Sequence, residues 1–102
     1  WCIGKAFDHS APIGPITPLA QAGDVNNAEI SLQVNGGDRQ RSNVNKLIWN
    51  VAETIEHLSA AWALQPGDLI YTGTPEGVAA VVQGDTLVGE VAGLGQLKVQ
   101  II

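Results

Sequence analysis

The stretch Glu29-Ile30-Ser31-Leu32-Gln33-Val34-Asn35 decides the fold, because apolar and polar side chains alternate along it. A period of two puts the three apolar side chains on one face of a strand and the polar ones on the other. Asn35-Gly36-Gly37-Asp38 comes next, and residues of these types accept the positive φ angles of a tight hairpin turn. The pattern predicts a half-buried strand and a returning strand that begins at residues 39–41.

After the hairpin, apolar residues recur three and four positions apart, which predicts one amphipathic helix over about residues 44–63. The stripe consists of Leu47, Val51, Ile55, Leu58 and Trp62. Ser42 or Asn43 is the expected N-cap, and Pro66-Gly67 closes the far end. Because an amphipathic helix must cover its apolar side, we expect it to pack on a sheet face.

The remaining apolar runs follow Gly or Pro turns and predict short strands at 69–72, 86–91 and 96–102. Residues 10–18 contain three prolines, which predicts an extended loop instead of a helix or central strand. The fold class is therefore mixed α/β and β-rich, and 102 residues suit one small domain.

Composition excludes several classes of protein. The chain has ten acidic and five basic residues, so its net charge of -5 disfavours a nucleic-acid-binding role. No apolar run reaches the roughly 20 residues of a membrane span, and a hydrophobic content of 45% argues against disorder. The single Cys2 fits a reducing compartment, so we expect a cytoplasmic location. The first residue is Trp1, which suggests a processed chain or a fragment.

Two segments carry candidate chemistry. Lys5 follows Gly4, but the spacing of a phosphate-binding loop is missing. Apolar neighbours predict that the stem of Lys5 is partly buried, which would make its ammonium a strong local anion stabiliser. In the loop 72–77, a Thr hydroxyl and free amides beside glycines suit a carboxylate. A tight turn in which the hydroxyls bond their own backbone explains the same loop equally well.

The other reactive residues have simpler interpretations. Asp8 and His9 are adjacent, but no carboxylate or His cluster shows metal-ligand spacing, so a structural or solvated role is expected for both. His57 lies four residues after Glu53 on the predicted helix, which predicts a surface pair. Cys2 has no neighbouring base and is not expected to be a nucleophile.

Several separated motifs, in order, resemble the fumarylacetoacetate hydrolase family over essentially the whole chain. They are Gly4–Asp8, Ser10–Gly14, Val34–Gly36, Arg39-Gln40, Ile48-Trp49, Pro66–Val78, Gly84-Asp85 and Gly93–Gly95. The segment from Trp1 to Ser10 looks most like the acylpyruvate or fumarylpyruvate hydrolase branch. The resemblance implies that residues 1–102 are the C-terminal part of the family's β-sandwich roll, and that the N-terminal part is absent.

The resemblance also implies an activity and a site. Members of this branch hydrolyse a carbon–carbon bond in 2,4-diketo acids such as fumarylpyruvate, in aromatic-compound catabolism. Lys5 matches the family's active-site lysine, and Gly73 and Thr74 match positions that hold the substrate carboxylate. His9 falls near the outer metal shell of some members. The implied partners are a small-molecule substrate and a second subunit of a homodimer, without nucleic acid or membrane.

A divalent metal, Mg²⁺ or Mn²⁺, is the implied cofactor. The family holds it on a Glu-x-Glu pair and an Asp that precede the lysine segment, and this chain contains no Glu-x-Glu pair. We therefore expect the isolated chain to be inactive as a hydrolase. Two alternatives stay open: an isomerase, decarboxylase or keto–enol tautomerase of the same family, and a non-catalytic binding or assembly module.

Overall fold

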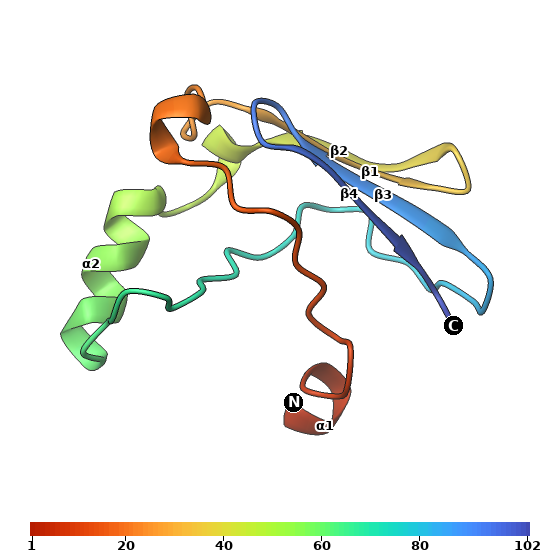
Figure 1. Cartoon of the computed structure of the whole chain (residues 1–102), viewed down its shortest axis with the longest axis horizontal. Coiled ribbons are helices and arrows are strands. Elements are labelled where there is room, and N and C mark those ends of the chain that lie inside the picture. Colours follow the sequence, from red (N-terminus) through yellow and green to blue (C-terminus); the bar gives the residue numbers. More distant parts are fainter.

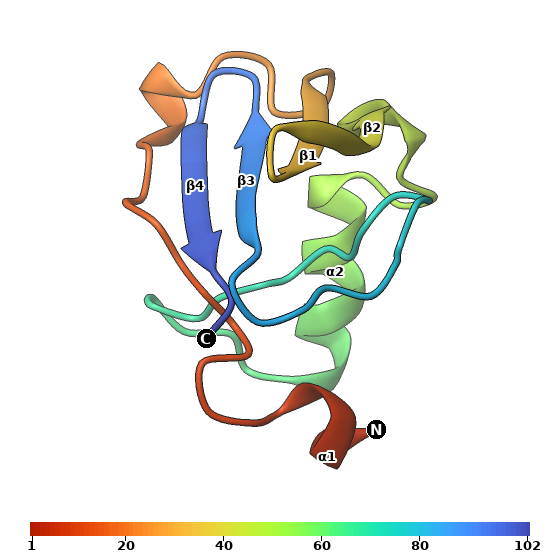
Figure 2. The same cartoon turned by 90° about the vertical axis from the view of Figure 1, so that its right-hand side faces the viewer.

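A computed structural model describes all residues, 1–102, and its centre is one four-stranded antiparallel sheet (Figures 1 and 2). The strands are β1 (Glu29–Val34), β2 (Gly37–Asn43), β3 (Thr86–Val91) and β4 (Gly95–Gln100). Their order across the sheet is β2-β1-β3-β4. The β-rich mixed fold expected from the sequence is therefore confirmed.

The helices are short and lie outside the sheet (Figure 1). They are the α-helices α1 (Cys2–Lys5) and α2 (Val51–Ala61), and the 3₁₀ turns η1 (Leu19–Gln21) and η2 (Val44–Lys46). None is long and apolar enough to cross a bilayer. Residues 10–18 are extended up to η1, as their prolines predict.

The hairpin forms where the alternating pattern predicts it. Asn35 and Gly36 take φ angles of 51° and 82°, so both turn residues occupy the left-handed region. Leu32 pairs with Gln40 and Gln33 pairs with Asp38, which leaves Arg39 as one extra residue on β2. This β-bulge bends β2 at the point where the 74–80 segment meets it.

The predicted bounds of the helix, 44–63, are wrong at both ends. β2 continues to Asn43, whose side chain accepts a hydrogen bond from the Asn45 amide at 2.9 Å and caps η2. The α-helix begins later because Asn50 forms a capping box with Glu53. At the other end Trp62 is already extended, with φ -131° and ψ 146°.

Two predictions of packing and pairing are also wrong. Residues 69–72 run extended but pair with no strand, so they form no strand of their own. The helix α2 stands beside the sheet instead of on it, and none of its residues is buried (Figures 1 and 2). Leu58 of α2 and Trp62, which follows the helix, line a groove together with residues 68–72.

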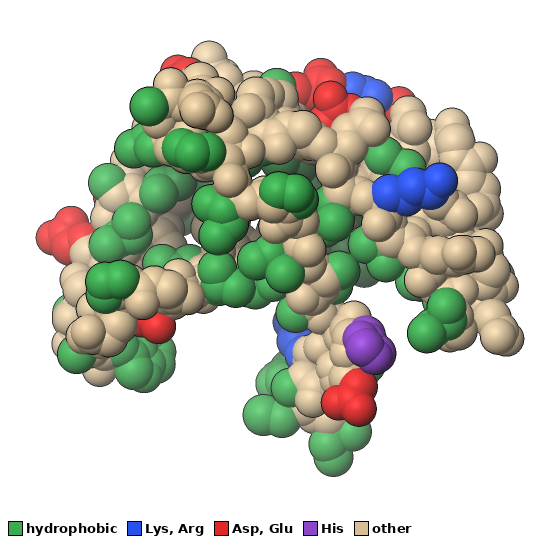
Figure 3. Space-filling view, in the orientation of Figure 1, with side chains coloured by type: hydrophobic (Ala, Val, Ile, Leu, Met, Phe, Trp, Pro, Cys, Tyr) green, Lys and Arg blue, Asp and Glu red, His purple; other side chains and the backbone are tan.

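Little of the chain is enclosed. Only Ala22, Ala28 and Val34 are buried, and the accessible surface is 8069 Å². A compact protein of this mass exposes about 5,500 Å². Figure 3 shows hydrophobic side chains along the hollow beneath the sheet. The hydrogen-bonded sheet, and not a closed core, therefore holds the chain together.

One carboxylate joins the hairpin turn to the start of β3. Asp85 accepts hydrogen bonds from the Val82 amide at 2.9 Å and from the Asn35 side chain at 2.8 Å. The Asn35 side chain in turn accepts one from the Thr86 amide at 2.9 Å. The bonds from Val82 and then Asn35 hold the pKa of Asp85 below its ordinary value of 3.8.

Asn50→Ala should loosen α2, because it removes the side-chain half of the capping box. We expect a loss of about 1 kcal/mol in the local stability of the helix. Faster hydrogen exchange of the α2 amides, with unchanged exchange in β1 and β3, would be the measured result. Asn50→Asp keeps the acceptor and serves as the control. Equal exchange in the wild type and Asn50→Ala would refute the assignment of this cap.

Acid should destabilise the chain through Asp85. Because its folded-state pKa lies below its unfolded value, its contribution is present above about pH 4 and is lost as pH falls through the folded pKa. Asp85→Asn should flatten the acid limb of a plot of unfolding midpoint against pH. Glu56→Gln, on exposed α2, should leave that limb unchanged. An acid limb that is as steep in Asp85→Asn as in the wild type would contradict this role.

Candidate functional site

Thr74 and Gly73 line a cavity of about 630 Å³ against the apolar face of the sheet. The floor includes Ile30 and Leu32 of β1 and Leu97 of β4. This volume suits a small organic molecule. The structure thus places both residues that the sequence singled out in this loop at one cavity.

The floor of the cavity is one transverse row of the sheet. The pairing register aligns Gln40, Leu32, Gly89 and Leu97 on neighbouring strands, so their side chains share one face. Gly89 contributes no side chain, and a Cβ built on it would have Leu97 O, at 3.9 Å, as its nearest neighbour. The open space above the row therefore comes partly from this glycine.

Gln40 connects the row to the loop that carries Thr74. Its Nε2 donates to Thr74 Oγ1 at 2.9 Å, to Pro75 O at 2.7 Å and to Glu76 O at 3.3 Å. One side-chain amide thus ties three consecutive loop residues to β2, although this loop forms no strand of its own.

The loop also fits closely against β2 at Gly77. Its φ is 101°, and a Cβ there would lie 2.6 Å from the carbonyl oxygen of Arg39. Arg39, the bulge residue, reaches on to donate from Nη1 to Ala80 O at 3.3 Å. A glycine is required at this point because any side chain would push the loop away from the strand.

The extended segment 10–17 borders the opposite side of the cavity. Tyr71 Oη donates to Ala11 O at 3.4 Å, and Thr17 Oγ1 donates to Leu94 O at 3.4 Å. Tyr71 and Thr17 both line the cavity, together with Gly14. These long contacts place the proline-rich segment beside β4.

Lys5 does not line this cavity. It ends α1, which projects below the sheet and away from the loop around Thr74 (Figures 1 and 2). Lys5 is exposed, so the prediction of a partly buried stem is wrong; its Nζ lies 5.4 Å from the ring centroid of Trp1, which is itself exposed. The structure therefore brings Gly73 and Thr74 together but leaves Lys5 apart.

The residues present do not fit a metal site. No group of three or more His, Cys, Asp or Glu side chains converges in the chain. His9 is exposed, with a φ of 64°, and no metal-ligating group gathers around it. Glu90 is the one charged residue that lines the cavity, and its carboxylate accepts from Gln96 Nε2 at 2.8 Å. An anion in the cavity would thus meet neutral donors, and Glu90 would be its one charged neighbour, of like sign.

The predicted pair of Glu53 and His57 does not form. Glu53 is engaged in the capping box, where its side chain accepts from the Asn50 amide at 2.9 Å. His57 instead stacks on Trp49, with 4.1 Å between the ring centroids and 25° between the planes. The cap and the stacking together explain why the i,i+4 spacing yields no ion pair here.

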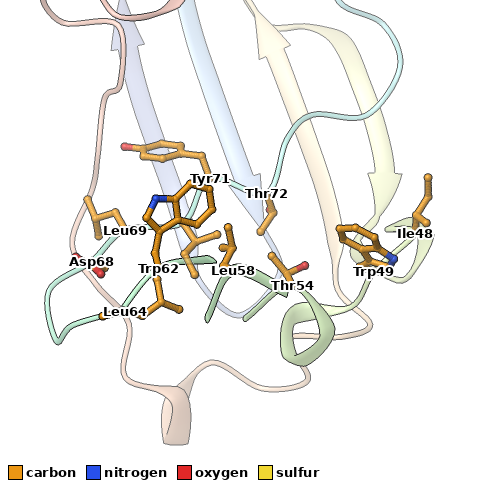
Figure 4. A pocket seen from close by; sticks show the side chains of 12 residues that line it. Ile48, Trp49, Thr54, Leu58, Trp62, Leu64, Asp68, Leu69, Tyr71 and Thr72 are labelled. Carbon is orange, nitrogen blue, oxygen red and sulfur yellow. The ribbon is translucent and has the colours of Figure 1, made fainter. Parts of the chain in front are cut away.

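A larger groove of about 810 Å³ lies between α2 and residues 68–72. Figure 4 shows Trp62 next to Tyr71 at one end, with Trp49 and Ile48 at the other. Its one charged residue, Asp68, already accepts from the Gln65 amide at 2.8 Å. Because the groove is mostly apolar and contains neither Gly73 nor Thr74, we assign the candidate site to the smaller cavity.

Neither Gln40 nor Tyr71 was predicted from the sequence to be a site residue. The sequence pattern does not reveal Gln40, because counting the hairpin back from its turn puts Arg39 opposite Leu32 and places Gln40 on the polar face. The bulge at Arg39 shifts that count by one residue, and only the register shows it. Tyr71 lies in an apolar run that predicts a strand, and this pattern does not indicate which side chains line a cavity.

The sheet, the cavity and the threonine–glycine loop define a β-sheet domain with space for a small molecule on one sheet face. The chain belongs to the fumarylacetoacetate (FAA) hydrolase C-terminal family, whose model matches residues 1–102.

Known relatives agree with this assignment. The chain is 48% identical over 101 residues to a fumarylpyruvate hydrolase of a Ralstonia species, covering 99% of this chain and 52% of that protein. It is 39% identical over 88 residues to the oxaloacetate tautomerase YcgM of Escherichia coli, covering 85% and 40%. The chain thus spans about half the length of the curated relatives it matches, or less.

A solved structure shows the same fold. The crystal structure of fumarylpyruvate hydrolase from Pseudomonas aeruginosa, in complex with Mn²⁺ and pyruvate, superposes with a TM-score of 0.96 at 57% identity. The match covers 100% of this chain and 44% of that one. The sheet and helix described above are therefore those of the C-terminal part of a fumarylpyruvate hydrolase structure.

Gly89→Ala should raise the stability of the chain by about 0.5–1 kcal/mol, because the new Cβ meets only ordinary contacts and glycine is costly within a strand. Gly77→Ala is the matched opposite and should lower stability, since its φ is positive and its Cβ would clash with Arg39. Urea unfolding of the two variants measures both effects. Destabilisation by Gly89→Ala would show that the floor of the cavity has no room for a side chain at this position.

Proposed function

We propose that this chain is the substrate-binding, C-terminal part of a metal-dependent hydrolase that cleaves a carbon–carbon bond of acylpyruvates such as fumarylpyruvate. The proposal includes a cytoplasmic homodimer that acts in the breakdown of aromatic compounds. The observation that carries it is the Thr74 loop, held at a small-molecule-sized cavity in a fold that a relative complexed with Mn²⁺ and pyruvate shares.

Within this proposal, Thr74 and Gly73 bind the carboxylate of the substrate. Gly73, with a φ of 94°, has open space where a Cβ would stand, so an anion can approach its backbone. The Thr74 hydroxyl donates to one carboxylate oxygen and fixes the orientation of the keto acid. A hydrogen bond to a charged group of this kind contributes about 1.5–3 kcal/mol.

Lys5 supplies positive charge where negative charge develops. Cleavage of the carbon–carbon bond leaves the pyruvate unit as an enolate, whose charge resides on oxygen. An ammonium near that oxygen stabilises the transition state by several kcal/mol in a dry site. The role requires α1 to lie closer to the cavity than it does in Figure 1. The chain's own residues supply neither the metal site nor a residue that activates water.

A second candidate, oxaloacetate tautomerase or decarboxylase activity, has a specific observation in its favour. The match to the oxaloacetate tautomerase of Escherichia coli covers 85% of this chain. The substrate of such an enzyme is also a keto acid with a carboxylate, so Thr74 would serve it equally well. The two reactions differ in whether a water molecule is added.

A chimera tests the hydrolase proposal. Residues 1–102 would replace the matching 44% of the Pseudomonas aeruginosa enzyme. We expect the chimera to hydrolyse fumarylpyruvate with Mn²⁺, and Thr74→Val to raise KM about tenfold or more, because one charged hydrogen bond is lost. Lys5→Ala should lower kcat about a hundredfold or more, as loss of an oxyanion donor does.

Thr72→Val is the matched control, since Thr72 faces the larger groove and not the smaller cavity. It should leave KM and kcat unchanged. A folded chimera that tautomerises oxaloacetate but does not hydrolyse fumarylpyruvate would favour the second candidate. The chain alone should show no turnover, and robust turnover would contradict the assignment of the metal site to other residues.

A further inference from the structure

We infer that Gln40 is a positioning residue: its side-chain amide occupies a lone pair of the Thr74 hydroxyl and so turns the hydroxyl proton away from Gln40, toward a bound ligand. The inference rests on the proposed function, in which Thr74 faces the substrate. It adds Gln40, which lies on β2 outside the Thr74 loop and favours ligand groups that accept a hydrogen bond from Thr74.

The first step is the orientation of the Gln40 amide. Pro75 O and Glu76 O are backbone carbonyls, which only accept hydrogen bonds, and both lie within reach of the same side-chain atom, at 2.7 and 3.3 Å. A flipped amide would bring its oxygen against both carbonyls. The NH₂ group of Gln40 must therefore face the loop, and its orientation follows from the network.

The second step is the polarity of the Thr74 hydroxyl. The same NH₂ group lies 2.9 Å from Thr74 Oγ1 and has no lone pair to offer. Thr74 Oγ1 is thus the acceptor in this contact, and its own proton points elsewhere. Because Thr74 lines the cavity, that proton is available to a ligand there.

The third step is that contacts within the protein set this arrangement. Gln40 lies on β2, half-buried, in register with Leu32. The close approach of Gly77 to Arg39 keeps the loop within reach of its amide. A hydroxyl whose direction is already set does not have to reorganise when it binds an anion.

The consequence is a selection by hydrogen-bond polarity. A carboxylate, which only accepts, gains a full hydrogen bond from Thr74. An ammonium group, which only donates, would meet a hydroxyl that already accepts from Gln40 and has one lone pair left. At Thr74 the site therefore favours a carboxylate over an ammonium group.

A double-mutant cycle on the 102-residue chain tests this inference, with pyruvate as the probe in an NMR titration. In Gln40→Glu, the carboxylate lacks the NH₂ donor and can take the Thr74 proton for itself. We expect this variant to weaken pyruvate binding about tenfold, the worth of one such hydrogen bond. The added negative charge repels a carboxylate in either background, so in a Thr74→Val background the same substitution should still weaken binding, but clearly less than tenfold, because no hydroxyl is left to orient.

Equal weakening by Gln40→Glu in both backgrounds would overturn the inference, because it would show that Gln40 affects pyruvate binding independently of the Thr74 hydroxyl. Unchanged binding in Gln40→Glu would also overturn it. Gln40→Asn, which keeps the amide on a shorter side chain, should bind more tightly than Gln40→Glu if amide polarity matters. Equal binding by these two variants would count against it.

A second readout needs no ligand. The Gln40 side-chain NH₂ protons should exchange with solvent about tenfold or more slowly than those of exposed Gln83, and their shifts should change in Thr74→Val. Exchange as fast as that of Gln83, or no response to Thr74→Val, would refute the positioning role. Absence of pyruvate binding together with a protected NH₂ group would contradict carboxylate binding by Thr74 in this chain and leave the Gln40 geometry standing, whereas the hydrolase proposal itself is tested by the chimera.

Discussion

The hydrogen bonds from the Gln40 amide to the 74–76 segment are the contacts on which the site depends. This segment has no strand partner, so the ladder of the sheet does not hold it. Gln40 connects it to β2, and Gly77 allows the two backbones to approach. Without this attachment Thr74 would lie on a free loop, and the cavity would lose one wall.

Hydrogen bonds, and not a closed apolar core, hold the strands of the sheet in place, and the Thr74 loop is attached to the sheet in the same way. The radius of gyration is 14.7 Å, compared with about 13 Å for a compact chain of this length. Many large hydrophobic side chains are exposed, among them Trp62 and Tyr71. Apolar surface of this extent is typical of interfaces. The hairpin, the bulge and the Asp85 contacts fix the strands through hydrogen bonds instead.

The sequence predicted well where local patterns decide the structure. Period-two alternation and an Asn-Gly turn specify β1 and β2 because both signals lie within a few residues. The helix bounds failed because the apolar spacing continues through Leu47, while the capping box at Asn50 sets the true start. Residues 69–72 have strand composition, but pairing needs a neighbouring edge, which no local pattern reveals. The contact of Gln40 with Thr74 joins positions 34 residues apart, so only the assembled structure shows it.

The proposed role of Thr74, oriented by Gln40, is to bind the carboxylate of a keto acid. A crystal structure of the chain with pyruvate would locate this carboxylate. We expect one of its oxygens within about 2.6–3.2 Å of Thr74 Oγ1, while Gln40 Nε2 still contacts the same hydroxyl. Pyruvate in the groove beside α2, or a Thr74 hydroxyl turned away from the carboxylate, would refute this role.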